Sequence, residues 1–536
     1  MARTKRVIAA AAVGVIAVGS LAACGEKKKD KTPTGGGSNS AAANTGATVI
    51  LGTTDSKVTS LDPAGAYDLP SWTIYWNTFQ TLLYLPAGST TPTPDAAEKC
   101  EWTNPKLYTC KLKDGLTFSD GSPLTSEDVK FSFDRMIAIN DPEGPASLLE
   151  SLDKTEAPDA KTVTFSLKTE DATLPHKLTT GVGAIVSSKG SYPKDKLRED
   201  NKILGSGPYV LDNYKADQEA AFSVNAKYKG DAKAQNAKFV LKYYSEASTL
   251  KQAIQKGDVD VAFRGLTPTD VKDLRDKSGN GGYSVIDGEG TELRYVTFNV
   301  KTAPADQKAV RQAIAQVVDR EAIAKNVYND TVTPTYSMIP AGVQAHTDAF
   351  KEKYGAPDKN KAKAILDAAG LGGSPVSITL WYTPTRYGAV TADEYIELKR
   401  QLEGSGLFKV ELQSTEWQQY QTDYKAGKYP AFGLGWFPDF PDPDNYTAPF
   451  LYKGGYFKNN YDNPQLNELI TKSQGQNDRK AAEPTFAEIQ KITAEDAPVL
   501  PLWQGKQIAA ARTGVTGMKE TMDPSYIIRF SMIGKK

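Results

Sequence analysis

Hydrophobic and polar residues alternate with the period of a β-strand in several segments, and they recur at helical spacing in the segments between. The alternation is clearest in KTVTFSLKT at 161–169 and in ELRYVTFNV at 292–300. Helical spacing is clearest at 307–328. Further strands are predicted at 49–51, 107–118, 237–244, 257–263, 377–383, 408–414 and 431–437, and further helices at 71–83, 127–139, 248–256, 391–404 and 415–427.

The order of these elements divides the chain into regions. The stretch from 77 to 202 is rich in hairpins and has one or two helices, whereas strands alternate with helices on both sides of it. Such alternation is typical of α/β layers, so we expect two α/β units around a hairpin-rich insertion. The segment 498–511 is predicted to form strands that pack back on an earlier domain. A chain of 536 residues has room for two to four domains.

The first residues read as an export signal rather than as part of the fold. A basic start with Arg3, Lys5 and Arg6 precedes an apolar run and then Leu-Ala-Ala-Cys, ending at Cys24. This pattern predicts a signal peptide at 1–23 and lipid attachment to Cys24. A general secretory signal with an incidental cysteine is the alternative. Residues 24–44 lack apolar periodicity, so they are predicted to tether a folded body to the outer face of a membrane.

Two further cysteines flank a predicted turn. Cys100 and Cys110 lie on either side of Asn104-Pro105, so a hairpin would bring them together. Because export makes oxidation plausible, we expect a disulfide between them. Two free thiols are the alternative. A zinc site is not expected, since no other Cys or His lies nearby.

Several function classes lack support in the composition and the motifs. The 64 basic and 64 acidic residues cancel, and there is no long basic stripe, so a nucleic-acid partner is not expected. His176 and His346 lie in no metal-ligand spacing, and phosphate-loop, dinucleotide-binding and nucleophile-elbow motifs are missing. We therefore expect no catalytic residue, metal or cofactor. An exported hydrolase that uses paired carboxylates remains an alternative.

Several stretches carry a resemblance to one family, and together they span nearly the whole mature chain. They are LKDGLTFSDGSPLTSEDVKFSFDRM at 112–136, GSGPYVL at 205–211, LRYVTFNV with VRQAIAQVVDREAI within 293–323, and GWFPDFPDPDNY at 435–446. The first is the most specific. In these stretches the chain resembles the extracytoplasmic solute-binding proteins of ABC importers, in the family 5 group that binds dipeptides and oligopeptides.

The resemblance implies a bilobal, periplasmic-binding-protein-like (type II) α/β fold with a smaller inserted α+β domain. Ligand would bind between the two lobes and be buried by hinge closure. Two crossovers would join the lobes, near 288–292 and 496–502. The implied domains are a discontinuous first lobe at 45–76, 203–290 and 500–536, an inserted domain at 77–202, and a second lobe at 291–499.

The resemblance also implies a role for the stretch at 435–446. In peptide-binding members, the aspartate three residues after the Gly-Trp pair binds the ligand's α-ammonium group, and Asp439 holds that position here. A cation buried in a closed cleft needs a paired carboxylate. The competing interpretation is that Asp439 only caps a proline turn. A metal loop is disfavoured, because Asp439, Asp442 and Asp444 lack the glycine and distal glutamate of an EF-hand.

Other positions match segments that line the ligand cleft in the family. They are Trp436, Phe437, Trp417 and Trp503 on one side, and Leu69 with Ser71 on the other. An extended peptide could pair with the backbone near 68–72 and 434–437, as an added strand. The aromatic residues could equally belong to the core.

The chain departs from the family pattern at two positions. Some oligopeptide binders carry arginines where this chain has Tyr424 and Gly433, which weakens the support for a bound ligand carboxylate. The length of the ligand is therefore open. The aromatic residues also suit sugars, so an oligosaccharide receptor of the same family is an alternative, and a signalling or adhesion lipoprotein is another.

The expected partners follow from the same resemblance. They are a small peptide or oligosaccharide, the permease subunits of an ABC transporter, and the membrane that holds Cys24. The chain is expected to be a binding protein and not an enzyme, and to act as a monomer at the outer face of the cell membrane.

Overall fold

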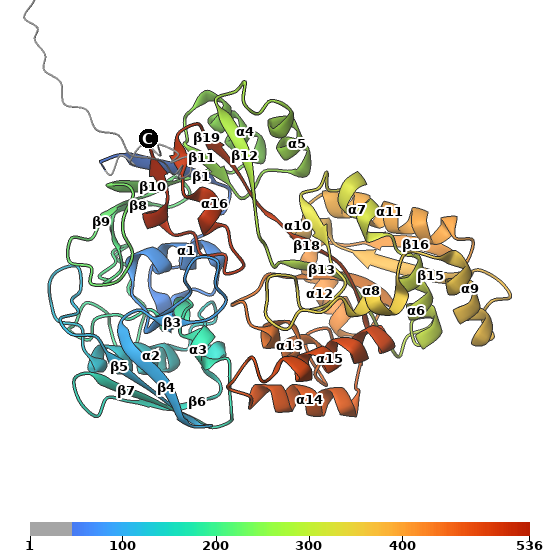
Figure 1. Cartoon of the computed structure of the whole chain (residues 1–536), viewed down its shortest axis with the longest axis horizontal. Coiled ribbons are helices and arrows are strands. Elements are labelled where there is room, and N and C mark those ends of the chain that lie inside the picture. Colours follow the sequence, from blue (N-terminus) through green and yellow to red (C-terminus); the bar gives the residue numbers. More distant parts are fainter. Residues whose placement is uncertain (1–45) are drawn as a thin grey trace, which may run out of the picture. The chain divides into compact units, whose positions relative to one another are not determined.

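The computed structural model describes residues 46–536, in which three sheets of four or more strands organise the chain (Figure 1). The predicted signal peptide at 1–23, the lipidated Cys24 and the tether at 24–44 lie outside the described residues. Between 46 and 536, no helix has the length and apolar character needed to cross a bilayer.

The first lobe is built on a seven-stranded sheet in the order β12-β19-β11-β1-β10-β9-β8. β1 lies parallel to β10 and β11, and the other neighbouring pairs are antiparallel. The strands are β1 (Thr48–Thr53), β8 (Tyr209–Lys215), β9 (Glu219–Val224), β10 (Lys238–Tyr243), β11 (Val261–Phe263), β12 (Tyr283–Gly288) and β19 (Gln507–Arg512), and the helices are α1 (Leu69–Thr78), α4 (Ala247–Lys256), α5 (Pro268–Asp276) and α16 (Met518–Thr521).

Helix α1 begins where the sequence supplies a cap. The Asp68 carboxylate accepts a hydrogen bond from the Ser71 backbone N–H at 2.8 Å, and Pro70 lies in the first turn, where no N–H donor is needed. Trp72 and Tyr75 point into the core beneath the sheet. Leu69 and Pro70, at the start of α1, are by contrast only half-buried, and they line a neighbouring cavity.

The small domain is built on a four-stranded antiparallel sheet in the order β4-β5-β7-β6. Cys100 and Cys110 lie opposite each other in β4 and β5 and form a disulfide, which confirms that prediction. The capping box at Thr125 and Asp128 starts a helix as predicted. The elements are β2 (Leu83–Tyr84), β3 (Thr93–Pro94), β4 (Ala97–Asn104), β5 (Leu107–Leu112), α2 (Ser126–Ile139), β6 (Leu152–Glu156), β7 (Thr162–Leu167) and α3 (Leu174–Lys177).

The second lobe is built on a six-stranded mixed sheet in the order β14-β18-β13-β17-β15-β16. Its strands are β13 (Leu293–Phe298), β14 (Val332–Pro334), β15 (Val376–Tyr382), β16 (Phe408–Ser414), β17 (Ala431–Trp436) and β18 (Val499–Gly505). Its helices are α6 (Lys308–Val317), α7 (Arg320–Asn326), α8 (Ala349–Tyr354), α9 (Lys359–Ala368), α10 (Pro384–Tyr387), α11 (Val390–Gly404), α12 (Trp417–Lys425), α13 (Ala448–Leu451), α14 (Pro464–Gln474) and α15 (Glu483–Asp496).

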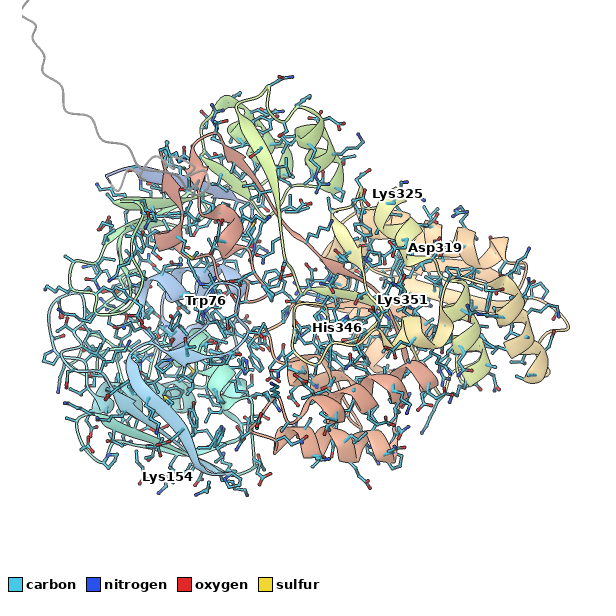
Figure 2. All side chains as sticks on the ribbon, viewed as in Figure 1. Trp76, Lys154, Asp319, Lys325, His346 and Lys351 are labelled. Atoms are coloured by element: carbon cyan, nitrogen blue, oxygen red, sulfur yellow. A yellow bond between two sulfur atoms is a disulfide. The ribbon has the colours of Figure 1, made fainter. Side chains whose placement is uncertain are left out.

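One predicted helix is two helices in the structure. The segment 307–328 was expected to be continuous, but the backbone is extended at Val318 and the chain restarts as α7. Asp319, labelled in Figure 2, caps the new helix, because its carboxylate accepts a hydrogen bond from the Ala322 N–H at 3.0 Å. The spacing of apolar residues gave no sign of the break, because α6 and α7 both bury residues in the same hydrophobic cluster.

Two connections join the lobes, and they run side by side. β12 leads into β13 through residues 289–292, and β18 leads into β19 through Lys506. The Gly505 N–H donates to the Glu292 carbonyl at 2.9 Å, so the connections form a two-stranded ribbon. The segment 498–511, predicted to form strands that pack back on an earlier domain, is divided between the lobes, because β18 pairs with β13 and only β19 joins the seven-stranded sheet.

The fold is thus α/β and bilobal with a smaller α+β domain, as predicted. The residue boundaries of the lobes, at 45–76, 203–290 and 500–536 for the first, 77–202 for the inserted domain and 291–499 for the second, stay a prediction.

Candidate functional site

A cavity of about 1060 Å³ is lined by residues of both lobes. In the second lobe, β15, β16 and β17 are parallel, so their carboxyl ends meet at one edge of the sheet. The residues that follow these three strand ends line the cavity: Arg386 and Tyr387 after β15, Trp417 after β16, and Phe437, Pro438 and Asp439 after β17. Ligands of α/β sheets bind at such carboxyl edges.

The first lobe contributes the same kind of edge. β1, β10 and β11 are parallel neighbours, and Asp55 and Arg264 follow the ends of β1 and β11 into the cavity wall. Tyr67 and Leu69 add the segment that enters α1. The cavity therefore lies between two sets of parallel strand ends.

Asp439 is held by groups from both lobes. Its Oδ2 accepts from the Asn445 side-chain amide at 3.0 Å, and its backbone N–H donates to Asn445 Oδ1 at 3.0 Å. Its Oδ1 accepts from the Tyr67 hydroxyl at 2.6 Å, and Tyr67 lies in the first lobe. The carboxylate is thus fixed in the cavity wall by neutral donors.

The electrostatics of Asp439 follow from this setting. Within residues 46–536, no Lys, Arg or His nitrogen lies within 4.0 Å of its carboxylate. Burial raises the pKa of Asp439, while the hydrogen bonds from Tyr67 and Asn445 act in the opposite direction. A half-buried carboxylate without a cationic partner is suited to bind a cation of the ligand.

The predicted aromatic residues Trp436, Phe437, Trp417 and Trp503 all line the cavity. Trp436 donates from Nε1 to Asn445 Oδ1 at 3.1 Å, so the amide that holds Asp439 also holds this indole. The Phe437 ring lies 4.3 Å from the Tyr526 ring, centroid to centroid.

Trp503 is almost fully buried, and its orientation is set from behind the cavity wall. Its Nε1 donates to Glu394 at 2.6 Å, and the same carboxylate accepts from the Tyr328 hydroxyl at 2.7 Å. Burial raises the pKa of Glu394. Trp503 thus belongs to the core of the second lobe and also lines the cavity.

The two predicted residues of the first lobe lie differently. Leu69 lines the cavity, but Ser71 is not among its lining residues. The Ser71 hydroxyl donates to Asp68 at 2.8 Å and accepts from the Thr59 N–H at 3.0 Å. Ser71 is fully buried, so its hydroxyl stabilises the start of α1.

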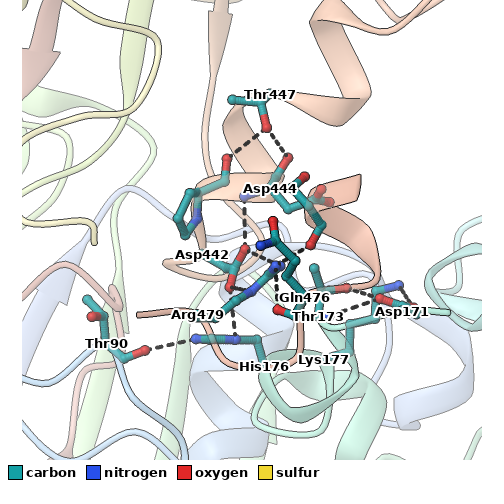
Figure 3. A network of polar contacts seen from close by, with 12 residues as sticks. Thr90, Asp171, Thr173, His176, Lys177, Asp442, Asp444, Thr447, Gln476 and Arg479 are labelled. Atoms are coloured by element: carbon teal, nitrogen blue, oxygen red, sulfur yellow. Dashed lines mark hydrogen bonds and ion pairs between the residues drawn. The ribbon is translucent and has the colours of Figure 1, made fainter. Parts of the chain in front are cut away.

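Asp442 holds the turn of the stretch at 435–446 (Figure 3), since its Oδ1 also accepts from the Asp444 N–H at 2.8 Å. Asp442 is completely buried and receives two hydrogen bonds from Arg479, at 2.9 and 2.8 Å. Burial, with Asp442 nearby, raises the pKa of Asp444 to about 7. No group of three or more His, Cys, Asp or Glu among residues 46–536 could hold a metal ion, so the metal-loop interpretation gains no support.

His176 of the small domain packs against the same turn. Its Nε2 lies 2.8 Å from the Thr90 carbonyl, which can only accept, so the proton of the neutral ring is on Nε2. Its Nδ1 then faces Asp442 at 3.4 Å, and the ring stacks on Phe440. Burial lowers the pKa of His176. The turn that carries Asp439 is therefore anchored to the small domain.

Several residues that line the cavity belong to no motif in the sequence. Arg294 is paired with Glu292 and packs over the rings of Tyr387 and Trp503, at 4.4 and 5.3 Å. Arg386 is exposed in the cavity, lies 5.8 Å from the Trp417 ring, and has no carboxylate within 4.0 Å among the described residues. Its place directly after a predicted strand end was the one cue that could have drawn attention to it.

Comparison with known proteins agrees with this geometry. The model of the bacterial extracellular solute-binding proteins, family 5, matches residues 91–458. The dipeptide-binding protein DppE of Bacillus subtilis is 25% identical over 514 residues, which cover 90% of this chain and 91% of that protein. The heme-binding protein A of Haemophilus influenzae is 26% identical over 79% of this chain and 81% of its own length.

A solved structure shows the same fold. It is the ABC transporter-associated periplasmic binding protein DppA from Helicobacter pylori in complex with the peptide STSA. It superposes with a TM-score of 0.72 at 22% identity and covers 91% of this chain and 98% of its own.

Two α/β lobes with a cavity between their strand ends define a bilobal solute-binding protein. The chain belongs to the bacterial extracellular solute-binding proteins, family 5. It is therefore a solute-binding protein of the ABC-importer type.

Proposed function

We propose that the cavity binds a short peptide through the peptide's two charged ends. The observation that carries this proposal is that some charged side chains in the cavity wall have an oppositely charged partner within the protein and others do not. Arg264 is paired with Asp55 at 3.2 Å, and Arg294 with Glu292. Asp439, Arg386 and Asp68 have no oppositely charged partner within 4.0 Å among residues 46–536, and both carboxylate oxygens of Asp68 already accept hydrogen bonds from Ser71 at the start of α1. A ligand with one ammonium and one carboxylate group would balance Asp439 and Arg386.

The ammonium end is assigned to Asp439. Its ionised carboxylate would pair with the α-ammonium group, and the Tyr67 oxygen, which donates its proton to Asp439, keeps lone pairs that can accept from the same group. Closure of the cleft removes water from this pair and strengthens it. The relatives named for dipeptide and peptide binding are consistent with such a ligand.

The carboxylate end is assigned to Arg386. Its guanidinium can make a two-pronged contact with a carboxylate, which compensates for the arginines missing at Tyr424 and Gly433. Tyr424 is fully buried, and a side chain at Gly433 would collide with the Tyr395 hydroxyl, so neither position could hold a cavity arginine in this structure.

Native mass spectrometry of the purified protein, followed by calorimetric titration, tests the proposal. Ligand carried through purification should have the mass of a peptide. A dipeptide should bind more tightly than its N-acetylated and its C-amidated forms. Retention of an oligosaccharide or a heme, with no binding of peptides, would contradict the proposal, and turnover of the added peptide would favour a hydrolase.

We further propose that Cys24 carries a lipid and that the bound peptide is delivered to permease subunits of an ABC importer. The signal-like residues before Cys24 support the first point, and the family supports the second. Cys24→Ser should release the protein from the membrane fraction into the medium, while the affinity for peptide stays unchanged. Membrane attachment of the variant at the level of the parent protein would contradict the lipid anchor.

A further inference from the structure

Glu394 is a buried carboxylate that the proposed binding of a peptide does not use. It lies on α11 in the second lobe, is 4% exposed, and is not among the residues that line the cavity. Within residues 46–536, no Lys, Arg or His nitrogen lies within 4.0 Å of its oxygens. Because burying a carboxylate without a cation costs free energy, such a group is a candidate for a functional role.

One oxygen of Glu394 holds the Trp503 side chain. Its Oε2 accepts from Trp503 Nε1 at 2.6 Å and from the Tyr328 hydroxyl at 2.7 Å. The Tyr328 ring also packs on the indole, with 4.7 Å between the ring centroids. Since Nε1 is the one polar atom of an indole, the Glu394 oxygen and the Tyr328 ring together fix how the indole is turned within the cavity wall.

Trp503 in turn supports the Arg294 guanidinium. The Cζ atom of Arg294 lies 5.3 Å from the centre of the Trp503 ring and 4.4 Å from that of the Tyr387 ring. A cation is attracted to an aromatic face, so the position of the guanidinium depends on the plane of the indole. Arg294 and Trp503 both line the cavity, whereas Glu394 and Tyr328 do not.

Arg294 lies directly against the strand that leads to Asp439. A Cβ on Gly435 would lie 2.3 Å from Arg294 Nη1, so the guanidinium fills the space beside this glycine of β17. The turn that carries Asp439 follows β17. A continuous series of contacts therefore runs from Glu394 through Trp503 and Arg294 to this strand.

We propose that Glu394 is a positioning residue of the cavity: it holds the Trp503 indole, and through it the Arg294 guanidinium, in the one arrangement that fits the ligand. Glu394 acts through these side chains and does not contact the ligand itself. The inference rests on the proposed peptide-binding function, because a dipeptide is the ligand with which it is tested.

Loss of the acceptor should loosen this part of the wall. Glu394→Met keeps the length of the side chain but leaves Trp503 Nε1 and the Tyr328 hydroxyl buried without a partner. The indole can then turn toward the cavity, and a bound dipeptide has to select the original arrangement from several. We expect dipeptide affinity to fall by about tenfold. The preference for a dipeptide over its N-acetylated form should stay, because the charge of Asp439 is untouched.

Glu394→Gln is the conservative variant. The Gln carbonyl oxygen can accept from both donors, so calorimetric titration should give a dipeptide affinity within about twofold of the parent's. Thermal unfolding checks that the variants fold. If Glu394→Met does not fold, Glu394→Asp takes its place with the same expected loss, since it keeps the charge but withdraws the oxygen from the indole.

Trp503→Phe tests the route of the effect. A phenyl ring has no N–H, so Glu394 has no indole to hold in that background. Glu394→Met added to Trp503→Phe should therefore change dipeptide affinity by less than about twofold, and the double-mutant cycle measures the coupling of the two side chains.

Fluorine NMR reports on the indole itself. The chain has 7 tryptophans, so protein labelled with 5-fluorotryptophan gives a small set of signals, and Trp503→Phe identifies the one from Trp503. Without any peptide, this signal should shift or broaden in Glu394→Met and return to the parent position in Glu394→Gln. A role in stability alone would leave it in place in the folded variants.

Glu397→Met is the matched control. Glu397 lies one turn further along α11 and is 9% exposed. It accepts from Arg400 and Gln401, and neither of these lines the cavity. This variant should keep the parent's dipeptide affinity and the parent's Trp503 signal.

The outcomes separate the two proposals. If no dipeptide binds to the parent protein, the proposed function is wrong, and the inference that rests on it is wrong too. If dipeptides bind to the parent but Glu394→Met binds them as tightly, if Glu394→Gln loses as much as Glu394→Met, or if the loss persists beside Trp503→Phe, only the positioning role is wrong. A loss that Gln restores, that Trp503→Phe removes and that Glu397→Met does not reproduce would support it.

Discussion

Asp439 and Asp442 lie three residues apart on either side of Pro441, yet the structure gives them opposite surroundings. Asp442 is fully buried and receives two hydrogen bonds from the Arg479 guanidinium. Asp439 faces the cavity and is held by Tyr67 and Asn445, which are neutral. One carboxylate has its cation within the protein, and the other does not.

The difference separates structural acids from recognition acids. A buried ion pair such as Asp442 with Arg479 is complete, so a ligand cation could only disrupt it. An acid positioned by neutral donors keeps its geometry without losing its negative charge. The ion pair of Asp442 with Arg479 and the stacking of His176 on Phe440 then hold the turn that carries Asp439 before a ligand arrives.

The largest effect is expected from Asp439→Asn. The amide leaves the ligand ammonium without a counter-ion in the closed cleft, which should cost about 3–5 kcal/mol, or a few hundred-fold or more in peptide affinity. Titration calorimetry measures it, and the midpoint of thermal unfolding should change little. Unchanged affinity would remove Asp439 from the site and favour a ligand without an ammonium group.

Asp442→Asn should act on stability instead. It leaves the Arg479 cation buried without a carboxylate, which should lower the free energy of unfolding by about 3 kcal/mol. Denaturant unfolding measures the change. At temperatures where the variant is folded, the charge preference between a dipeptide and its N-acetylated form should persist. A loss of that preference with stability intact would show that the two acids are not functionally distinct.

The pH dependence of binding should come from Asp439. Only its ionised form pairs with an ammonium group, and its raised pKa means that protonation begins at a higher pH than for an exposed aspartate. Affinity should be level above that pKa and fall by about tenfold for each pH unit below it. Calorimetry across the range from about pH 4 to 8 measures the slope. Asp439→Asn should abolish the slope, and a slope that survives would assign it to another group.

Tyr67→Phe should have the smallest effect of this set. It removes the hydroxyl that donates to Asp439 at 2.6 Å but keeps the ring that stacks on Trp72. Since Tyr67 is 38% exposed, we expect a loss of about 1 kcal/mol, or fivefold in peptide affinity. An effect as large as that of Asp439→Asn would mean that Tyr67, and not the carboxylate, carries the recognition.

The spacing of Cys100 and Cys110 around a turn predicted the disulfide, and the family resemblance of a few short stretches implied the fold class and pointed to Asp439, Trp436 and Trp417, which line the cavity. They could not find Tyr67, which meets Asp439 from 372 residues away. They could not show that Ser71 lies outside the cavity wall, because a serine whose hydroxyl donates to the helix cap has the same sequence signature as one whose hydroxyl faces a ligand. The break between α6 and α7 was hidden for a related reason, since the apolar face continues across it.

The ribbon that joins the lobes has a mechanical consequence. Because the two connections are hydrogen-bonded to each other, any change in the angle between the lobes has to bend both of them together. A Cβ on Gly290 would lie 2.1 Å from the Gly505 carbonyl oxygen, which shows how closely the strands meet there. A side chain at Gly290 would force the two connections apart, so glycine at this position lets the link between the lobes stay narrow.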